Sequence, residues 1–421
     1  MLDLSRLLLQ LVVVLAAARA SGWLARRVGQ PRVIGEMVAG LVLGPSVFGA
    51  LAPATWAAVF PPASLPALAV VAQLGVILFL LIVGLRLDHG LLRARAGAAI
   101  ATSHASIAVP FALGVALAPL LPRSLAGAGV TPLAFALFVG AAMSVTAFPV
   151  LARILDERRL TGTRLGALAL AAAAVDDVSA WAILAGVVAV ARAGPAGGAW
   201  AAGLRTVGLT VLVVAGAFAL RPILRRVLAR ADGRVGAEQV AMAVLLALSL
   251  ALATEWAGVH ALFGAFLAGA VVPRGRGVAE ALAARMEELV TTALLPVFFA
   301  YAGLRASLAL IDGAALWAVF GAVMLVAVGG KLGGSAVAAR LGGLPWDEAL
   351  SLGILMNTRG LMELVILSIG LDVGAISPTF YAMMVLMALL TTVMTTPLLA
   401  LVERRRARAA ARTPRLDAAA G

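Results

Sequence analysis

Apolar residues fill this chain in repeated runs of about 20, and short polar segments separate the runs. A bilayer core needs about 20 consecutive apolar residues in a helix, because lipid leaves an isolated segment no other way to pair its backbone groups. We therefore predict an all-α polytopic membrane protein with about thirteen transmembrane helices. The predicted spans are residues 4–25, 33–50, 65–86, 97–120, 132–155, 163–191, 203–229, 237–256, 258–273, 286–305, 313–339, 347–371 and 378–402.

The segments between the runs alternate in charge. Every second one is rich in arginine, from Arg26 and Arg27 near the start to Arg404–Arg406 near the end. The others carry little beyond Arg123, Arg192, Arg205 and Arg305, and residues 51–64 contain no basic residue. Basic loops stay on the cytoplasmic side of a membrane. The alternation predicts a multi-pass protein of the plasma membrane (a bacterial inner membrane), with its N-terminus outside and residues 403–421 as a basic cytoplasmic tail.

Composition agrees with this class of protein. Of the 421 residues, 63% are hydrophobic and 13% are charged, and the mean hydropathy is +1.06. The net charge of +13 comes from arginines scattered at the ends of the apolar runs, so we expect membrane lipid and no nucleic acid as a partner. The chain has no cysteine, which excludes disulfides and thiolate metal sites.

Two adjacent acids, Asp176 and Asp177, lie in the middle of the apolar run Ala167–Val190. Each ionised carboxylate at a bilayer centre costs about 2.5–3.5 kcal/mol on insertion scales, and two side by side also repel each other. Such acids mark ion or proton pathways more often than they merely lock helices together, which remains the alternative. Neighbours in a helix point about 100° apart, so we expect one acid to face a fixed cation and the other a water-filled path.

The fifth predicted span is interrupted by a proline. Pro149 lacks a backbone donor and would clash with the carbonyl of Val145, and Thr146 offers a hydroxyl beside the freed backbone, with Ser144 two residues before it. An ordinary proline kink is the alternative.

The twelfth predicted span has an unusually polar middle, formed by Asn357, Thr358, Arg359, Gly360 and Glu363. Gly360 permits unwinding, and half-helix ends at membrane depth are tolerated only where they line a cavity. A pair of interrupted spans is therefore the best sequence indication of a transport site. The alternative for Arg359 and Glu363, spaced i, i+4, is a structural ion pair that neutralises itself.

Lys331 is the only lysine among the 33 lysines and arginines of the chain. It lies inside the eleventh predicted span between two pairs of glycines, which permit another helix to approach closely. Lysine, unlike arginine, can lose its proton when desolvated. A lysine that pairs with Asp176 and releases its proton when the pair breaks would do work that an arginine cannot. The alternative is a lysine that extends to the membrane surface.

Four segments, residues 35–46, 144–153, 175–181 and 356–364, resemble the monovalent cation/proton antiporters. The branch is that of bacterial sodium/proton and Kef-type potassium/proton antiporters, and the last segment is most similar to plant CHX-type exchangers. The resemblance extends from residue 30 to residue 402.

This resemblance implies a scaffold-and-core fold of inverted repeats with two crossing discontinuous helices, usually in a homodimer. Scaffold and dimerisation helices would be residues 1–95 and 237–311, the ion-transport core 97–191 and 312–402, and a linker helix 203–230. Asp177 would match the ion-binding carboxylate, and Asp176 the acid paired with Lys331. The expected site residues are Asp176, Asp177 and Lys331, with Thr146 and Ser144 at the cation and Pro149, Asn357, Thr358, Arg359, Gly360 and Glu363 supporting the broken helices.

The function implied is secondary antiport of Na⁺ or K⁺ against protons by alternating access, without ATP or another cofactor. Desolvation favours the neutral form of a carboxyl group, so we expect Asp177 to hold a proton or a cation but not both. The double acid resembles electrogenic members whereas the CHX likeness suggests potassium, so ion identity and stoichiometry stay open. A proton-gated cation channel, a non-transporting sensor and symport with an organic anion are the alternatives.

Overall fold

The computed structural model describes residues 3–86, 96–160, 162–193, 199–229, 235–257, 260–273 and 277–412. The described part is almost entirely helical, and one isolated antiparallel bridge, between Ala126 and Ile376, is its only β pairing. The prediction of an all-α membrane protein agrees with this structure.

The helices follow one another through short connections. In chain order they are α1 (Leu4–Arg27), α2 (Arg32–Leu43), α3 (Phe48–Leu51), α4 (Pro53–Val59), α5 (Leu65–Arg86), α7 (Ala96–Leu117), α8 (Pro132–Ser144), α9 (Phe148–Glu157), α10 (Arg164–Ala193), α11 (Ala199–Ala219), α12 (Arg221–Ala229), α13 (Ala237–Trp256), α14 (Ala261–Val271), α15 (Val278–Leu289), α16 (Leu295–Arg305), α17 (Gly313–Val328), α18 (Gly334–Leu341), α19 (Trp346–Met356), α20 (Leu361–Asp372) and α21 (Pro378–Arg412). Two π-helical turns, η5 (Val290–Leu294) and η7 (Gly329–Gly333), join α15 to α16 and α17 to α18.

Nine helical segments in the described part of the chain are long and apolar enough to cross a bilayer, and the bent pair α19–α20 makes ten. The predicted count of thirteen is not confirmed by this criterion. The other predicted spans fall on α8–α9, α10 and α14. Of these, α8 has 13 residues and α14 has 11, fewer than the roughly 20 that one continuous helix needs.

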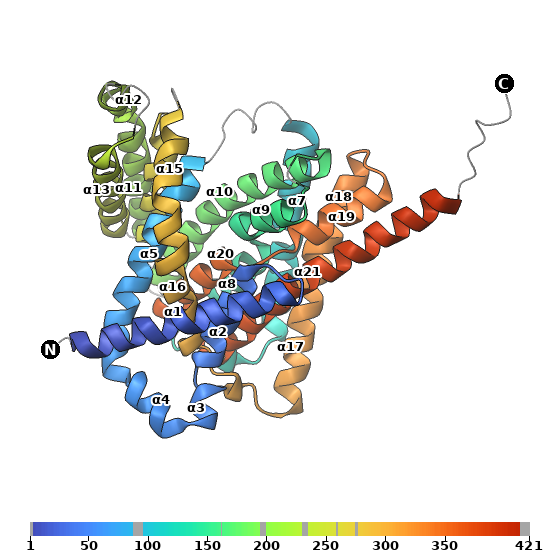
Figure 1. The fold of residues 1–421 in the computed structure, drawn as a ribbon, viewed down its shortest axis with the longest axis horizontal. Helices are drawn as coiled ribbons and strands as arrows, with labels where there is room; N and C mark the ends of the chain where they lie inside the picture. Colours follow the sequence, from blue (N-terminus) through green and yellow to red (C-terminus); the bar gives the residue numbers. More distant parts are fainter. Residues whose placement is uncertain are drawn as a thin grey trace.

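The helices pack as two sets (Figure 1). The first set contains α1, α2, α5, α13, α14, α15 and α16, and the second contains α7, α8, α9, α10, α18 and α19 with the turn η7. Helix α11 contacts α10 of the second set and both α13 and α14 of the first, and α21 contacts helices of both sets. Helices α8 and α20 lie in the middle of the molecule, and α20 contacts α16 of the first set and α8 of the second.

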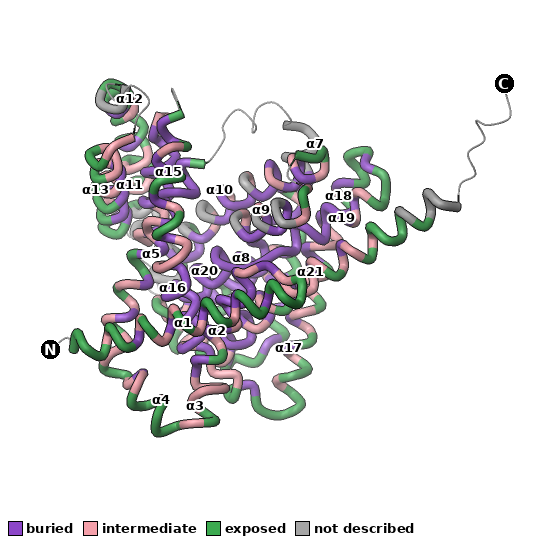
Figure 2. Tube along the Cα trace, viewed as in Figure 1, coloured by how far each residue is buried: buried purple, intermediate pink, exposed green. Residues whose placement is uncertain are grey.

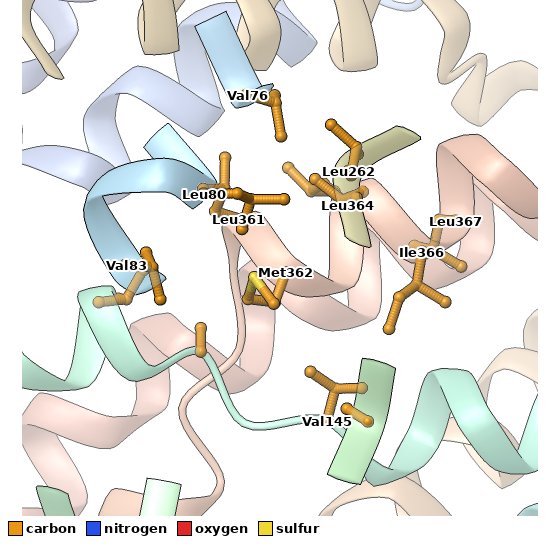
Figure 3. Packing of buried hydrophobic residues seen from close by; sticks show 14 of the residues in the cluster. Val76, Leu80, Val83, Val145, Leu262, Leu361, Met362, Leu364, Ile366 and Leu367 are labelled. Atoms are coloured by element: carbon orange, nitrogen blue, oxygen red, sulfur yellow. The ribbon is translucent and has the colours of Figure 1, made fainter. Parts of the chain in front are cut away.

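Burial is greatest where the two sets meet (Figure 2). All ten residues Leu361–Gly370 of α20 are buried, whereas much of α1 and α13 is exposed, as expected of helices that face lipid. Figure 3 shows Val76 and Leu80 of α5 beside Leu361 and Leu364 at the start of α20. Apolar side chains therefore form the contact between α5 of the first set and α20 at this level.

Glycines permit the closest helix contact within the first set. A Cβ on Gly303 of α16 would lie 2.0 Å from the carbonyl carbon of Gly40 in α2, and a Cβ on Gly40 would lie 2.1 Å from the carbonyl oxygen of Phe299. Small residues of this kind let membrane helices pack backbone to backbone. The two helices can therefore pack this closely only because both positions are glycine.

We predict that Gly303→Val lowers the free energy of unfolding by about 1–3 kcal/mol or more, because overpacking pushes α2 and α16 apart. Thermal unfolding of the purified protein in detergent measures the loss. Gly321→Val in α17 is the matched control, since a Cβ there meets nothing within 4 Å. Equal melting temperatures for the two variants would contradict the close contact.

Candidate ion-binding site

The first discontinuity lies between α8 and α9. Thr131 caps the start of α8, because its hydroxyl accepts a hydrogen bond from the backbone N–H of Ala134 at 3.2 Å. It ends at Ser144, and the chain then runs without helical structure through residues 145–147 before α9 begins. Pro149 falls in the first turn of α9, where a missing backbone donor costs least. Its side chain lies outside the described residues.

The second discontinuity lies between α19 and α20, which are bent by 42° relative to each other. The backbone N–H of Ala147 donates to the carbonyl of Thr358 at 3.0 Å, so the two interrupted segments are joined directly. The Thr146 hydroxyl lies 3.1 Å from the carbonyl of Met356, the last residue of α19. A Cβ on Gly360 would lie 2.8 Å from Val150, so this glycine lets α9 approach α20. The predicted crossing of two discontinuous helices is present.

Arg359 satisfies backbone groups that the first break leaves unpaired. Its guanidinium donates to the carbonyls of Ala142 at 3.0 Å and Met143 at 2.7 Å, in the last turn of α8. It also pairs with Glu363 at 2.6 Å, and both side chains are fully buried. The cation therefore lies at the negative end of the α8 dipole, as helix electrostatics favour. The i, i+4 ion pair that the sequence analysis gave as the alternative for these two residues is formed.

Thr392 of α21 supports the second break. Its hydroxyl donates to the carbonyl of Arg359 at 2.6 Å and accepts from the backbone N–H of Arg359 at 3.0 Å. Thr358 lies 3.4 Å from Thr395, oxygen to oxygen. Asn357 is buried, and its side-chain oxygen has no hydrogen-bond partner.

Lys331 lies in the π-helical turn η7 and is fully buried. A Cβ on Gly330 would lie 3.1 Å from Pro110 of α7, and one on Gly334 would lie 2.9 Å from Val109. These glycines bring η7 close to α7, as the sequence predicted. The ammonium group of Lys331 is thereby held inside the protein and does not extend to the membrane surface.

Asp176 receives hydrogen bonds from four side chains. Ser103 donates to its Oδ1 at 2.6 Å, and Thr146 and Lys331 donate to its Oδ2 at 2.7 and 2.9 Å. Ser106 lies 2.9 Å from Oδ1 and 2.7 Å from Oδ2. The pairing with Lys331 expected from the sequence is present, and both side chains are fully buried.

Asp177 has the opposite surroundings. Its residue is 2% exposed, and neither carboxylate oxygen has a hydrogen-bond partner. A buried carboxylate without a partner is costly unless a proton or a cation neutralises it. Two neighbours in one helix thus differ completely in their contacts.

Ser144, expected at the cation, uses its two polar groups elsewhere. Its hydroxyl donates to the carbonyl of Ala141 at 2.8 Å, and its carbonyl accepts from the Lys331 ammonium. Of the hydroxyl-bearing residues in the predicted site, Thr146 is the one bonded to an acid.

A cavity of about 470 Å³ opens where the two helix sets meet. Its lining includes Glu36 of α2, Arg86 of α5 and Glu287 of α15, with Arg86 and Glu287 joined as an ion pair. It extends to Val150 of α9 and Leu361 of α20, which follow the two breaks. The cavity therefore leads from charged residues at one end of the interface toward the crossing.

The opposite end of the same interface is closed. Arg305, the last residue of α16, pairs with Asp372, the last residue of α20, at 2.6 Å. Tyr381 of α21 donates to the carbonyl of Ala302 at 3.0 Å close by. The space left there is about 30 Å³, and Ser368 is among its lining residues.

Sequence reasoning missed Ser103 and Ser106, although they contact Asp176 as closely as any residue it found. Their i, i+3 spacing puts them on one face of α7, and that spacing of hydroxyls in an apolar span was the available signal. Within the described residues no three His, Cys, Asp or Glu side chains gather to hold a resident metal ion. The unpartnered carboxylate of Asp177 is thus the candidate site for a transported cation.

Three sequence relatives extend this description. The chain is 41% identical over 394 residues to the Na⁺/H⁺ antiporter NhaS4 of Synechocystis sp., covering 93% of this chain and 96% of that protein. It is 40% identical to cation/H⁺ antiporter 17 of Arabidopsis thaliana and 34% identical to K⁺/H⁺ antiporter 1 of Saccharomyces cerevisiae. These matches cover 93% and 89% of this chain but 48% and 43% of the relatives, so the chain spans about half of their length.

The fold is similar to that of the sodium proton antiporter MjNhaP1 from Methanocaldococcus jannaschii. The TM-score is 0.66 at 16% sequence identity, with 96% of this chain and 99% of that chain covered. Residues 12–401 match the family described as sodium/hydrogen exchanger, transmembrane. These findings confirm the resemblance seen in the four sequence segments: the chain belongs to the transmembrane sodium/hydrogen exchanger family, whose members are transporters and not enzymes.

Proposed function

We propose that this protein is a secondary active antiporter that exchanges Na⁺ or K⁺ for protons at the Asp176–Asp177 pair, with Asp177 as the carboxylate that binds the ion. The observation that carries the proposal is the pair of Asp177 oxygens, which are buried and have no hydrogen-bond partner. The relatives named as Na⁺/H⁺, K⁺/H⁺ and cation/H⁺ antiporters support the same reaction.

Coupling follows from the charge of one carboxylate. An ionised Asp177 in an apolar interior is unfavourable, and either a proton or a monovalent cation neutralises it. The two ions compete for the same oxygens, so binding of one requires release of the other. Only the neutral forms cross the apolar interface readily, which makes exchange obligatory without ATP or a cofactor.

Alternating access uses the interface between the two helix sets. The structure is open toward the end where Glu36, Arg86 and Glu287 line the cavity, and closed at the end held by Arg305 and Asp372. Movement of α20 along its apolar contact with α5 would open the second end and close the first. A proton-gated channel would need a continuous pore, which a cavity closed at one end does not favour.

We also propose the orientation that the arginine pattern predicts. Arg158 donates to the carbonyl of Thr396 and pairs with Glu403, and Arg406 pairs with Glu348, so these basic segments share one side of the molecule. By the positive-inside rule that side is cytoplasmic. The cavity is lined by Arg86 at the end of α5, and the basic segment with Arg93 and Arg95 follows in the sequence, so the same rule makes the cavity open to the cytoplasm.

The division into scaffold and core, the homodimer and the identity of the cation, all expected from the sequence, stay predictions. We propose that the first set of helices is the scaffold and that the second set, with α17, α20 and α21, is the moving core. The homodimer would form through the scaffold. Carboxylate, hydroxyl and carbonyl oxygens suit both Na⁺ and K⁺, and the relatives include proteins named for each.

We predict that Asp177→Asn abolishes cation/proton exchange, because an amide can neither ionise nor take up a proton at the pH of the assay. Proton movement on addition of Na⁺, K⁺ or Li⁺ to proteoliposomes measures this loss. Asp347→Asn, the same change at an exposed acid in the first turn of α19, should keep activity near that of the unchanged protein. Exchange retained by the well-folded Asp177 variant would refute the proposal.

We predict that Asp372→Asn opens the closed end of the interface more often, because Arg305 loses its partner. A Ser368→Cys substitution supplies a reporter thiol there, and the chain has no cysteine of its own. Maleimide labelling of this thiol should become up to about five-fold faster, since exposed ion pairs contribute about 0.2–1 kcal/mol. The exposed acid Asp312, changed to Asn, serves as the control, and equal labelling in all backgrounds would exclude a gate at this pair.

A further inference from the structure

Helices α7 and α21 each have a proline in their interior, Pro110 and Pro397. A proline there has no N–H for the backbone carbonyl four residues earlier, and its ring also pushes against that carbonyl. The carbonyls released in this way are those of Ser106 and Val393. Lipid offers no donor to such a group, so a neighbouring part of the protein has to supply one.

Each of the two carbonyls accepts a hydrogen bond from a side chain that is distant in the sequence. Nζ of Lys331 donates to the carbonyl of Ser106 at 2.9 Å, and the side-chain amide of Gln30 donates to the carbonyl of Val393 at 3.1 Å. The first bond belongs to the site described above. The second lies outside it, and Gln30 there supplies the donor that Pro397 lacks.

Gln30 is held in place by the backbone of the first helix set. It lies between α1 and α2, directly after Gly29, whose φ of +73° is left-handed. Its backbone N–H donates to the carbonyl of Ala25 at 2.9 Å, and the N–H of Gly29 donates to that of Arg26 at 3.1 Å. These two bonds are the pattern that closes a helix at a left-handed glycine. The side chain of Gln30 therefore reaches α21 from a hydrogen-bonded turn of the first set.

The other end of this bond leads to the helix crossing. Val393 directly follows Thr392, the residue whose hydroxyl bonds to the backbone N–H and carbonyl of Arg359 at the second break. The side-chain oxygen of Gln30 is buried and has no hydrogen-bond partner among the described residues, so the side chain bonds to α21 alone. The bond from Gln30 therefore joins the first set to the helix that supports the ion site.

We propose that Gln30 is a positioning residue of the exchange cycle, which latches α21 to the first helix set in the access state of this structure by donating to the carbonyl that Pro397 leaves free. The inference rests on the alternating access proposed above, in which α21 moves with the core. Such a movement separates Gln30 from Val393 and leaves a carbonyl at membrane depth without its donor, which is unfavourable. The latch therefore favours the state in which the cavity beside α9 and α20 is open.

The pairing of Gln30 with Pro397 is tested by a double-mutant cycle on the full chain. Thermal unfolding in detergent is measured for the unchanged protein, Gln30→Ala, Pro397→Ala and the double variant. Alone, Gln30→Ala should lower the melting temperature, because the Val393 carbonyl loses its donor. Alanine in place of Pro397 restores the backbone N–H of α21 for that carbonyl, so Gln30→Ala should lose most of its effect in the Pro397→Ala background.

Pro378→Ala is the matched control, since Pro378 is the first residue of the same helix, where a backbone N–H would have no helical partner. In that background Gln30→Ala should keep its full effect. An equal loss of melting temperature in all three backgrounds would overturn the proposal. Should Gln30→Ala fail to fold by itself, Pro397→Ala should restore its folding, and a double variant that also fails would contradict the pairing.

The latch is tested by maleimide labelling of a Ser368→Cys reporter at the closed end. Gln30→Ala and Pro397→Ala should each speed labelling up to about ten-fold, the factor that the net contribution of one hydrogen bond gives, and the double variant should be no faster than Pro397→Ala. Pro397→Ala should meanwhile raise the melting temperature, because alanine favours a helix, so general loosening cannot explain faster labelling. Unchanged labelling would overturn the latch. Neither measurement requires transport, so absence of exchange would overturn only the function proposed above.

Discussion

The unpaired backbone groups at the crossing of α8–α9 with α19–α20 constrain everything around them. Two helices that end inside the membrane leave carbonyls that water cannot reach, so side chains must satisfy them. Arg359 does this for Ala142 and Met143, and Lys331 for Ser144. These cations in turn require buried anions, which Glu363 and Asp176 supply. The buried charges are thus a consequence of breaking two helices at membrane depth.

Because the crossing is neutralised in this way, the two adjacent acids of α10 have different roles. Asp176 belongs to the network that holds the broken helices, and its removal would leave a buried cation unpaired. Removing one partner of a buried ion pair typically costs about 3–5 kcal/mol of stability, so Asp176 stabilises the fold as well as balancing the charge of Lys331. Asp177 faces away from those donors and keeps its oxygens free. One acid stabilises the site, and the other remains available to an ion.

The contacts around the crossing also differ, since some are hydrogen bonds and others are apolar. The donors to Asp176 lie in the second set or, for Thr146, between its helices α8 and α9. Apolar side chains form the contact of α20 with α5. An apolar contact between two packed sets lets one slide on the other without breaking hydrogen bonds at every step. The ion pair of Arg305 with Asp372 at one end, and the cavity at the other, then distinguish two access states.

The sequence by itself determined the helical membrane class, the two acids, the breaks at Thr146 and Gly360, and the unusual Lys331. It could do so because lipid penalises every polar group, so each one within an apolar run is conspicuous. The sequence did not reveal Ser103 and Ser106, because a hydroxyl is tolerated in many membrane helices and stands out only beside its partner. Only the tertiary structure decided which acid is bonded and which is free. Whether an acid finds donors depends on how closely α7, α10 and η7 approach one another. Gly330 and Gly334, beside Lys331, set the distance between this segment and α7, which lies far away in the sequence.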